Sequence, residues 1–232
     1  MNQSTLLSEL KLRGIELSEK QLKQFDLYMN LLIEWNQRMN LTAITEPEEI
    51  NEKHFLDCLC LVNLIDPKAN MADIGSGAGF PAIPLLIALP DLHVTMVEPI
   101  SKRTLFLNEV IKQLELKNAV VLNVRSEDLA KTSREKFDVV SARAVAALPI
   151  LCEICVPLLK IGGNFVAMKG SSGLEEVEEA KNAMRILKLK VKEIKKEVLP
   201  SAGLRYNIVL NKTESTPLSY PRQYAQIKKR PL

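Results

Sequence analysis

A glycine-rich turn between two apolar segments constrains this chain more than any other feature. Three glycines recur at every second position in the run Asp73-Ile74-Gly75-Ser76-Gly77-Ala78-Gly79, which follows a strand-like pattern and precedes a helical one. Glycines permit a tight turn and a close approach of the backbone to a ligand, and the next helix directs its free N–H groups at that turn. The run therefore predicts a strand, a loop and a helix, with a nucleotide-like ligand at the loop.

The spacing of the glycines and the acid before them narrow the choice of ligand. A dinucleotide fingerprint reads G-x-G-x-x-G, whereas this loop reads G-x-G-x-G with Asp73 two residues before the first glycine. A carboxylate there repels a pyrophosphate but can accept a hydrogen bond from the ammonium group of S-adenosylmethionine. Glu98, at the end of the strand-like run 93–97, is placed to hold ribose hydroxyls in either cofactor. We expect S-adenosylmethionine rather than a dinucleotide; a glycine turn without a ligand is the alternative.

Strand-like and helical patterns alternate from residue 70 onward, which predicts an α/β fold with a doubly wound, mostly parallel sheet. Seven strands are expected, at 71–74, 94–98, 119–124, 137–142, 165–168, 189–193 and 207–211. Gly162-Gly163 is interpreted as the turn before the fifth strand. Ligands in such sheets bind at the carboxyl ends of the strands.

Residues 1–66 have helical periodicity throughout and are expected to form an N-terminal extension packed on the core, followed by a cofactor-binding domain at 67–232. Ser18 and Gln21 form a capping box for one helix, and a second helix is expected from about Pro47 to Ile65.

Composition indicates an ordinary globular protein, with 47% hydrophobic residues among 232. No apolar run has the length of a membrane span and no signal-peptide pattern is present, so a cytoplasmic location is expected. Four cysteines could suggest a metal site, but each lies in an apolar helical pattern and is interpreted as a core residue, and no metal is expected. The sequence has two histidines, His54 and His93, which leaves little material for a catalytic histidine network.

The net charge of +3 conceals a basic C-terminal region. Residues 185–232 contain 12 Lys or Arg and 3 Glu, whereas residues 1–184 contain 19 Lys or Arg and 25 Asp or Glu. Phosphate contacts with nucleic acid are one interpretation of this region. A solvated, charged helix is the other, because lysines between 188 and 196 are interspersed with glutamates.

An ordered set of motifs, more specific than the glycine loop alone, resembles the RsmG family, also called glucose-inhibited division protein B. The motifs are Asp73 to Leu85, Glu98 to Arg103, Asn123 to Glu127, Phe137 to Ala147 and Met168 to Gly170. The resemblance implies a class I, Rossmann-like, S-adenosylmethionine-dependent methyltransferase that acts on guanine N7 in 16S ribosomal RNA. It also implies 16S RNA as the partner, and we expect a ribosomal particle as the substrate form and a monomeric enzyme.

The resemblance also assigns site residues. Cofactor contacts are expected at Gly75, Phe80, Ser126, Glu127 and Arg143, to which the loop analysis adds Asp73, Gly77, Gly79 and Glu98. Substrate RNA is expected at Lys102, Arg125, Lys169 and Arg205, and catalytic roles at Arg143 and Lys169. Two positions depart from the family pattern: Ala82 replaces a frequent glycine, and residues 223–227 interrupt a tail that is usually richer in Lys, Gly and Pro.

The residues are consistent with attack by guanine N7. This atom has a lone pair and no proton, so its methylation needs neither a general base nor a nucleophilic side chain. After the fourth strand the chain reads Ser141-Ala142-Arg143-Ala144 and lacks an Asn-Pro-Pro-aromatic loop for an exocyclic amine. A small-molecule methyltransferase, a non-enzymatic S-adenosylmethionine-binding ribosome factor and an NAD oxidoreductase remain as alternatives.

Overall fold

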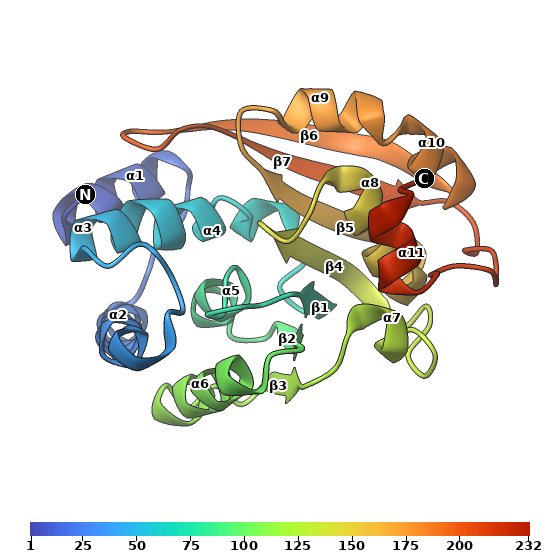
Figure 1. Cartoon of the computed structure of the whole chain (residues 1–232). Helices are drawn as coiled ribbons and strands as arrows, with labels where there is room; N and C mark the ends of the chain where they lie inside the picture. Colours follow the sequence, from blue (N-terminus) through green and yellow to red (C-terminus); the bar gives the residue numbers. More distant parts are fainter.

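Seven strands form one mixed sheet in the computed structural model, which describes residues 1–232 (Figure 1). In sequence the strands are β1 (Asn70–Ile74), β2 (His93–Val97), β3 (Ala119–Leu122), β4 (Phe137–Arg143), β5 (Leu159–Lys169), β6 (Leu189–Leu199) and β7 (Gly203–Lys212). Their order across the sheet is β3-β2-β1-β4-β5-β7-β6, with β7 antiparallel to both β5 and β6 and the other pairs parallel. The predicted seven-stranded, mostly parallel sheet is therefore confirmed.

Helices cover both faces of the sheet and divide the core in two. After the first strand come α5 (Ala82–Ala88), α6 (Ser101–Gln113), α7 (Ser126–Leu129), α8 (Leu148–Cys155), η3 (Val156–Leu158), α9 (Gly173–Glu179), α10 (Lys181–Ile186) and α11 (Tyr224–Lys229). One core joins α5 and α6 to the N-terminal helices, and the other joins α8, α10 and α11. Because helices cover both faces, β1 and β4 are buried along nearly their whole length.

The N-terminal helices pack directly against the glycine loop and the helix that follows it. They are α1 (Gln3–Leu12), α2 (Glu19–Met39), α3 (Pro47–Ile50), η1 (Asn51–Leu56), α4 (Asp57–Leu59) and η2 (Val62–Leu64). Tyr28 lies with its ring centroid 5.5 Å from both Phe55 and Phe80, so an aromatic cluster joins α2, η1 and the loop. The predicted capping box is present, since Ser18 and Gln21 bond each other's backbone N–H groups at the start of α2.

The expected helix from Pro47 to Ile65 is one irregular helix that ends earlier. It begins at α3, widens into the π-helical turn η1 and ends with α4, followed by a 3₁₀ turn, η2. A π turn inserts one extra residue per turn and is frequent at functional sites. Here it carries Lys53 and His54 to the edge of the cavities described below.

One expectation about the second half of the chain is wrong, and one of the two interpretations of its lysines is excluded. Gly162-Gly163 lies inside β5 rather than before it, because β5 begins at Leu159 and the register with β4 shifts along this stretch. Gly162 has φ +83°, and a Cβ on Gly163 would lie 2.8 Å from the carbonyl oxygen of Asp138. Both glycines therefore serve an irregular strand. The lysines between 188 and 196 lie mostly on strand β6 and form no charged helix.

All four cysteines are buried, which confirms their interpretation as core residues. Burial raises the pKa of Cys60 and of Cys152 to about 12, so both thiols stay protonated near neutral pH. None of the helices combines the length and the apolar character that crossing a bilayer requires.

Candidate functional site

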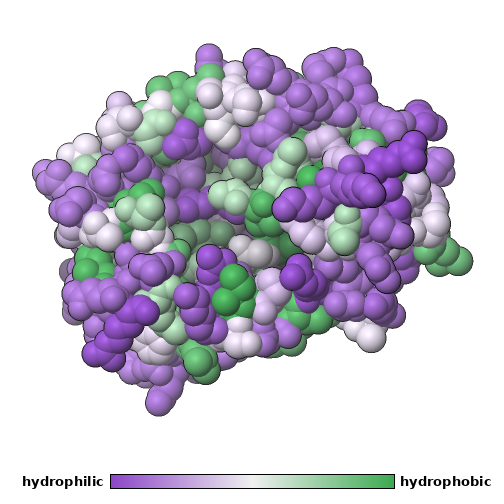
Figure 2. Space-filling view, in the orientation of Figure 1, coloured by the Kyte–Doolittle hydropathy of each residue, from purple (hydrophilic) through white to green (hydrophobic).

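Two adjoining cavities open at the carboxyl ends of the central strands. The larger has a volume of about 660 Å³ and the smaller about 410 Å³. His54 and the segment Arg143–Val145, which continues from β4, line both cavities and form the wall between them. Figure 2 shows the corresponding face as hollowed in the middle and rimmed mainly by hydrophilic residues. The position agrees with the rule that open α/β sheets bind ligands at the carboxyl ends of their strands.

The glycine loop lines the smaller cavity and is held in place by Glu98. Gly75 and Gly77 have φ values of +69° and +59°, which L side chains rarely adopt. The Glu98 carboxylate is buried and accepts hydrogen bonds from the N–H groups of Gly77 and Ile100, each 2.9 Å long. Gly79 faces the protein instead, because a Cβ there would lie 3.0 Å from the hydroxyl of Tyr28. Gly79 therefore permits helix packing, while Gly75 and Gly77 shape the cavity.

Asp73 lies fully buried beneath this loop with half of its carboxylate unpaired. Its Oδ1 accepts a hydrogen bond of 2.6 Å from the hydroxyl of Ser141, and its Oδ2 has no partner. Burial raises the pKa of Asp73 to about 7, and the bond from Ser141 opposes that increase. A buried, unpaired acceptor is costly for the fold unless a donor reaches it. A cationic donor, such as the ammonium group of S-adenosylmethionine, fits this chemistry.

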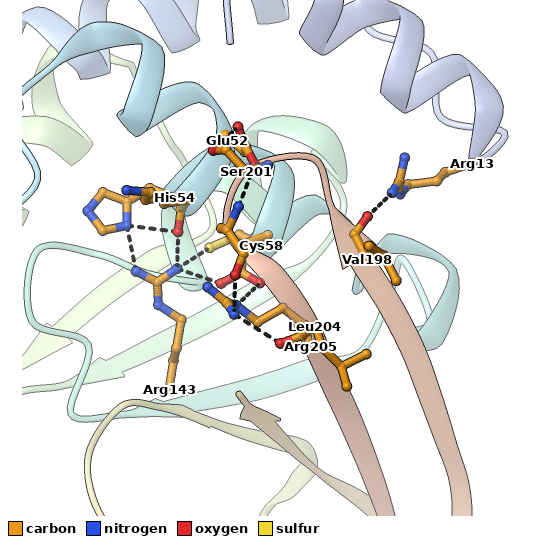
Figure 3. Close-up of polar contacts among 12 residues, drawn as sticks. Arg13, Glu52, His54, Cys58, Arg143, Val198, Ser201, Leu204 and Arg205 are labelled. Carbon is orange, nitrogen blue, oxygen red and sulfur yellow. Dashed lines mark hydrogen bonds and ion pairs between the residues drawn. The ribbon is translucent and has the colours of Figure 1, made fainter. Parts of the chain in front are cut away.

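Arg143, at the end of β4, is clamped by side chains from the N-terminal helices (Figure 3). Its Nη1 lies 3.1 Å from Oδ2 of Asp57, and its Nη2 lies 2.7 Å from Nδ1 of His54. The other oxygen of Asp57 lies 3.6 Å from Nε of Arg205, which comes from β7. Burial raises the pKa of Asp57, and the two guanidinium groups oppose this rise. One carboxylate thus joins two arginines that are far apart in sequence.

His54 is a neutral spacer between the two cavities. Its ring stacks on Phe80 with centroids 4.2 Å apart, and its Nε2 lies 2.9 Å from the hydroxyl of Thr42. Burial and the positive charge of Arg143 lower the pKa of His54 to about 3. Since an arginine can only donate, Nδ1 must accept from Arg143, and the proton therefore lies on Nε2. The histidine orients Arg143 and does not exchange protons near neutral pH.

Lys169 and Arg205 line the larger cavity together with Arg143. The ammonium group of Lys169 is buried and lies 2.7 Å from both a carboxylate oxygen of Glu176 and the carbonyl oxygen of Ala146. Four cationic side chains and two carboxylates contribute to this cavity: Lys53, Arg143, Lys169 and Arg205, with Asp57 and Glu176. The excess of positive charge favours a polyanionic ligand.

The structure brings together some predicted residues and separates others. Phe80, Glu98, Gly75 and Gly77 line the smaller cavity together with Arg143. Ser126 and Glu127 line a third, smaller cavity with the predicted substrate residue Arg125. Lys102 lines none of these three; its ammonium group donates to the carbonyl oxygen of Met39 from an exposed position.

Asp57 is absent from the residues predicted for the site, and His54 enters the prediction only as one of two histidines, too few for a catalytic histidine network. Both are polar residues in the run 54–59, which is otherwise apolar and helical. Their spacing of three residues puts them on one face of the helix, and this pattern could have marked them as a pair. The pattern alone does not reveal that Asp57 binds Arg143, because the two residues are 86 positions apart in sequence.

Comparisons with known proteins identify relatives of the whole chain. The family model of GidB, rRNA small subunit methyltransferase G, matches residues 21–203. The ribosomal RNA small subunit methyltransferase G of Desulfitobacterium hafniense (strain Y51) is 49% identical over 222 residues, which are 94% of this chain and 92% of that protein. The protein of the same name from Lysinibacillus sphaericus (strain C3-41) is 44% identical, with 100% of both chains covered.

Solved structures of lower sequence identity share the fold. M. jannaschii TYW2 in complex with AdoMet aligns with a TM-score of 0.54 at 17% identity, covering 66% of this chain and 72% of that one. A SAM-dependent O-methyltransferase from Thermotoga maritima aligns with a TM-score of 0.54 at 17% identity, and the alignment covers 80% of this chain and 72% of that one. The sheet and its flanking helices are therefore those of class I methyltransferases.

Proposed function

We infer the roles of the two cavities from the fact that this chain belongs to the rRNA small subunit methyltransferase G family. It is an S-adenosylmethionine-dependent enzyme that methylates N7 of a guanosine in 16S ribosomal RNA. The smaller cavity, at the glycine loop, holds the cofactor, and the larger one receives the guanosine with its phosphates. The observation that supports this division is that His54 and Arg143–Val145 line both cavities, so the cavities adjoin and a donor in one can face an acceptor in the other.

The residues that line the smaller cavity, together with Asp73 buried beneath the glycine loop, fit the cofactor. The unpaired oxygen of Asp73 accepts a hydrogen bond from the ammonium group of the cofactor. The Glu98 carboxylate accepts two backbone hydrogen bonds, and its remaining lone pairs accept from the ribose hydroxyls of the cofactor. Gly75 and Gly77 allow the backbone to approach closely, and Phe80 contributes an apolar wall. When bound, S-adenosylmethionine supplies an electrophilic methyl group on a sulfonium. The protein contributes position, because the reaction is an in-line displacement.

The larger cavity suits an RNA nucleotide. Lys53, Lys169 and Arg205 offer positive charge to phosphates, while Asp57 and Glu176 keep the local charge moderate. That balance matters because methylated guanine carries a positive charge, and an unneutralised cation beside it would repel the product. Arg143 and Lys169 are the catalytic residues of this proposal, since Arg143 lines both cavities and Lys169 lines the larger one.

Proton transfer has no part in this mechanism. Guanine N7 carries no proton, and the only histidine at the cavities, His54, is held neutral as a hydrogen-bond acceptor for Arg143. The side chains therefore hold the base in line with the methyl group and exclude misaligned poses. This agrees with the small number of histidines in the sequence.

We expect a ribosomal particle to be the substrate form and the enzyme to act as a monomer. The basic residues of β6 and α11 lie outside the cavities and support the first expectation, because they extend the positive surface beyond one nucleotide. A folded particle offers phosphates at fixed positions over a wide area, whereas naked RNA does not.

The experiment uses ribosomal RNA from cells that lack the protein. Purified enzyme is incubated with tritiated S-adenosylmethionine and either 30S particles or naked 16S RNA, and digested nucleosides are separated. We expect label in 7-methylguanosine, more of it from particles, and loss of at least about tenfold in rate for Lys169→Ala. Lys160→Ala is the matched control, because Lys160 lies exposed on the same strand and pairs with Asp138 away from the cavities. Label in another nucleoside, or an unaltered rate for Lys169→Ala, would refute the assignment.

A further inference from the structure

A third cavity, of about 150 Å³, adjoins the cofactor cavity, and Gly75, Pro99 and Val145 line both. Its walls are mostly apolar and come from the ends of β1 and β2 and from α8, through Ile74, Val97 and Ile154. A narrow apolar cavity beside a polar one matches a ligand with a flat ring at one end and charged groups at the other. This inference rests on the proposed function, in which the glycine loop holds S-adenosylmethionine.

The outer wall of this third cavity comes from the C-terminal part of the chain. Tyr224, the first residue of α11, lines the cavity although every other lining residue comes from much earlier in the sequence, at Ile154 or before. The guanidinium carbon of Arg125, which also lines the cavity, lies 5.6 Å from the centroid of the Tyr224 ring. A cation over an aromatic face is attracted to it, so Arg125 orients the ring at the rim.

A buried ion pair holds this segment in place. Glu153 of α8 is fully buried, and Arg222 donates to it through Nε at 2.8 Å, through Nη2 at 2.6 Å and through its backbone N–H at 2.9 Å. Ile227 of α11 is fully buried in the core that contains α8. Removing one partner of a buried charge pair is strongly destabilising, so this anchor fixes α11 against the sheet. Tyr224 is therefore part of a fixed wall.

We propose that Tyr224 is a cofactor-binding residue whose ring covers the adenine of S-adenosylmethionine in the third cavity. Ser126 and Glu127 lie at the polar edge of the same cavity and face the polar atoms of the base. The segment 223–227, where the sequence departs from the tail pattern of its relatives, therefore forms one wall of the cofactor site. It closes the cofactor site from the side opposite the N-terminal helices.

Calorimetry with two ligands tests the proposal. S-adenosylhomocysteine has both the adenosine and the amino acid group, whereas 5′-methylthioadenosine has only the adenosine. We expect Tyr224→Ala to lower the affinity for both ligands by the same factor. That factor should lie between about 5-fold and 150-fold, which is the range for loss of a base–aromatic contact. Tyr224→Phe keeps the ring and should bind like the wild type. Gln226→Ala, an exposed and uncharged position on the same helix, is the matched control and should change neither affinity.

A second variant separates this inference from the proposed function. Asp73→Asn should lower the affinity for S-adenosylhomocysteine and leave the affinity for 5′-methylthioadenosine unchanged, because only S-adenosylhomocysteine carries an ammonium group. If the wild type binds neither ligand, the proposed cofactor site is wrong. If the wild type binds both and Tyr224→Ala binds them equally well, the site stands and α11 has only a structural role. Tyr224→Leu, which keeps an apolar side chain without a ring, serves if the alanine variant does not fold.

Discussion

Asp73 destabilises the ligand-free fold, and a bound cation can remove that cost. Its pKa is raised by burial from 3.8 to about 7, so the unfolded chain ionises first as the pH rises. The folded state of the ligand-free protein therefore loses stability from this group between about pH 4 and pH 7, and no further above that range. The charged groups that act on it are Arg143, which lowers its pKa, and Glu98, which raises it.

Asp73→Asn should flatten that pH dependence. We expect the variant to gain stability relative to the wild type as the pH rises from about 5 to about 7.5, measured by urea unfolding without ligand. Its affinity for S-adenosylmethionine should fall by at least about tenfold at neutral pH, because a charge-assisted hydrogen bond is lost. Equal stability differences at both pH values would show that Asp73 is not buried in its charged form.

The neutral state of His54 leads to a prediction about the chemical step. At saturating cofactor, the single-turnover rate should stay level between about pH 6 and pH 8.5, because no group must lose a proton for N7 to react. RNA with 7-deazaguanine at the modified position should bind and stay unmethylated, since it keeps its Watson–Crick edge and lacks the N7 lone pair. A rate that rises about tenfold per pH unit would instead reveal a general base.

Among the elements, the edge strand β6 exposes a row of lysines. Lys196 lies beside Tyr206, level with Lys169 at the cavity end of the sheet, whereas Lys190 lies beside Asn211 towards the other end. Lys190, Lys192 and Lys196 are exposed on this edge strand, which runs up to the hairpin that Glu52 holds through Ser201. Lysines on an edge also prevent pairing with other strands. These lysines therefore protect the edge of the sheet, and we propose that they also contact RNA.

Changing these three lysines to glutamine should weaken RNA binding with little dependence on sequence. The slope of log K against log salt should fall by about one to two, since each phosphate contact contributes roughly 0.7 for single-stranded RNA. Lys112, Lys117 and Lys136, which are exposed and lie on other parts of the chain, form a control set with the same change of charge. Cofactor affinity should stay constant in both sets, and identical slopes for wild type and variant would leave only the edge-protecting role.

The parallel strands could be predicted from the sequence because they are short apolar runs that alternate with helices. The last two strands were found, but shorter than they are: 189–193 against β6, which ends at Leu199, and 207–211 against β7, which begins at Gly203. The missing end of β6 contains Lys195, Lys196 and Glu197, a charged run that resembles a solvated segment, and the missing end of β7 follows a turn and contains Gly203. The two ends form strands by pairing with each other. Arg205 lies in one of those ends, so its place at the cavity depended on a contact between strands.

At the scale of the whole molecule, the N-terminal helices and the sheet share one core. The hydroxyl of Tyr28, on α2, donates a hydrogen bond of 2.5 Å to the carbonyl oxygen of Ala78 in the glycine loop. A helix that begins at residue 19 thereby supports the backbone of the glycine loop. We expect residues 1–66 and 67–232 to unfold together in a single transition.

Tyr28→Phe tests this coupling. The variant should lose about 1–3 kcal/mol of unfolding free energy, because the buried carbonyl of Ala78 is left without its partner. It should also bind S-adenosylmethionine more weakly, although Tyr28 lines neither cavity. Tyr220→Phe is the control, since the Tyr220 hydroxyl makes no hydrogen bond within the protein. Two separate unfolding transitions, or loss of stability with unchanged affinity, would show that the extension and the loop are independent.

The carboxylate of Asp57 has a consequence for the order in which this enzyme becomes competent during its own synthesis. It is among the first quarter of the residues to leave the ribosome, yet its partners Arg143 and Arg205 emerge much later. Until β7 has been made and paired, the nascent chain has a glycine loop but an incomplete second cavity. We therefore expect a nascent chain to stay inactive until nearly the whole polypeptide has been translated.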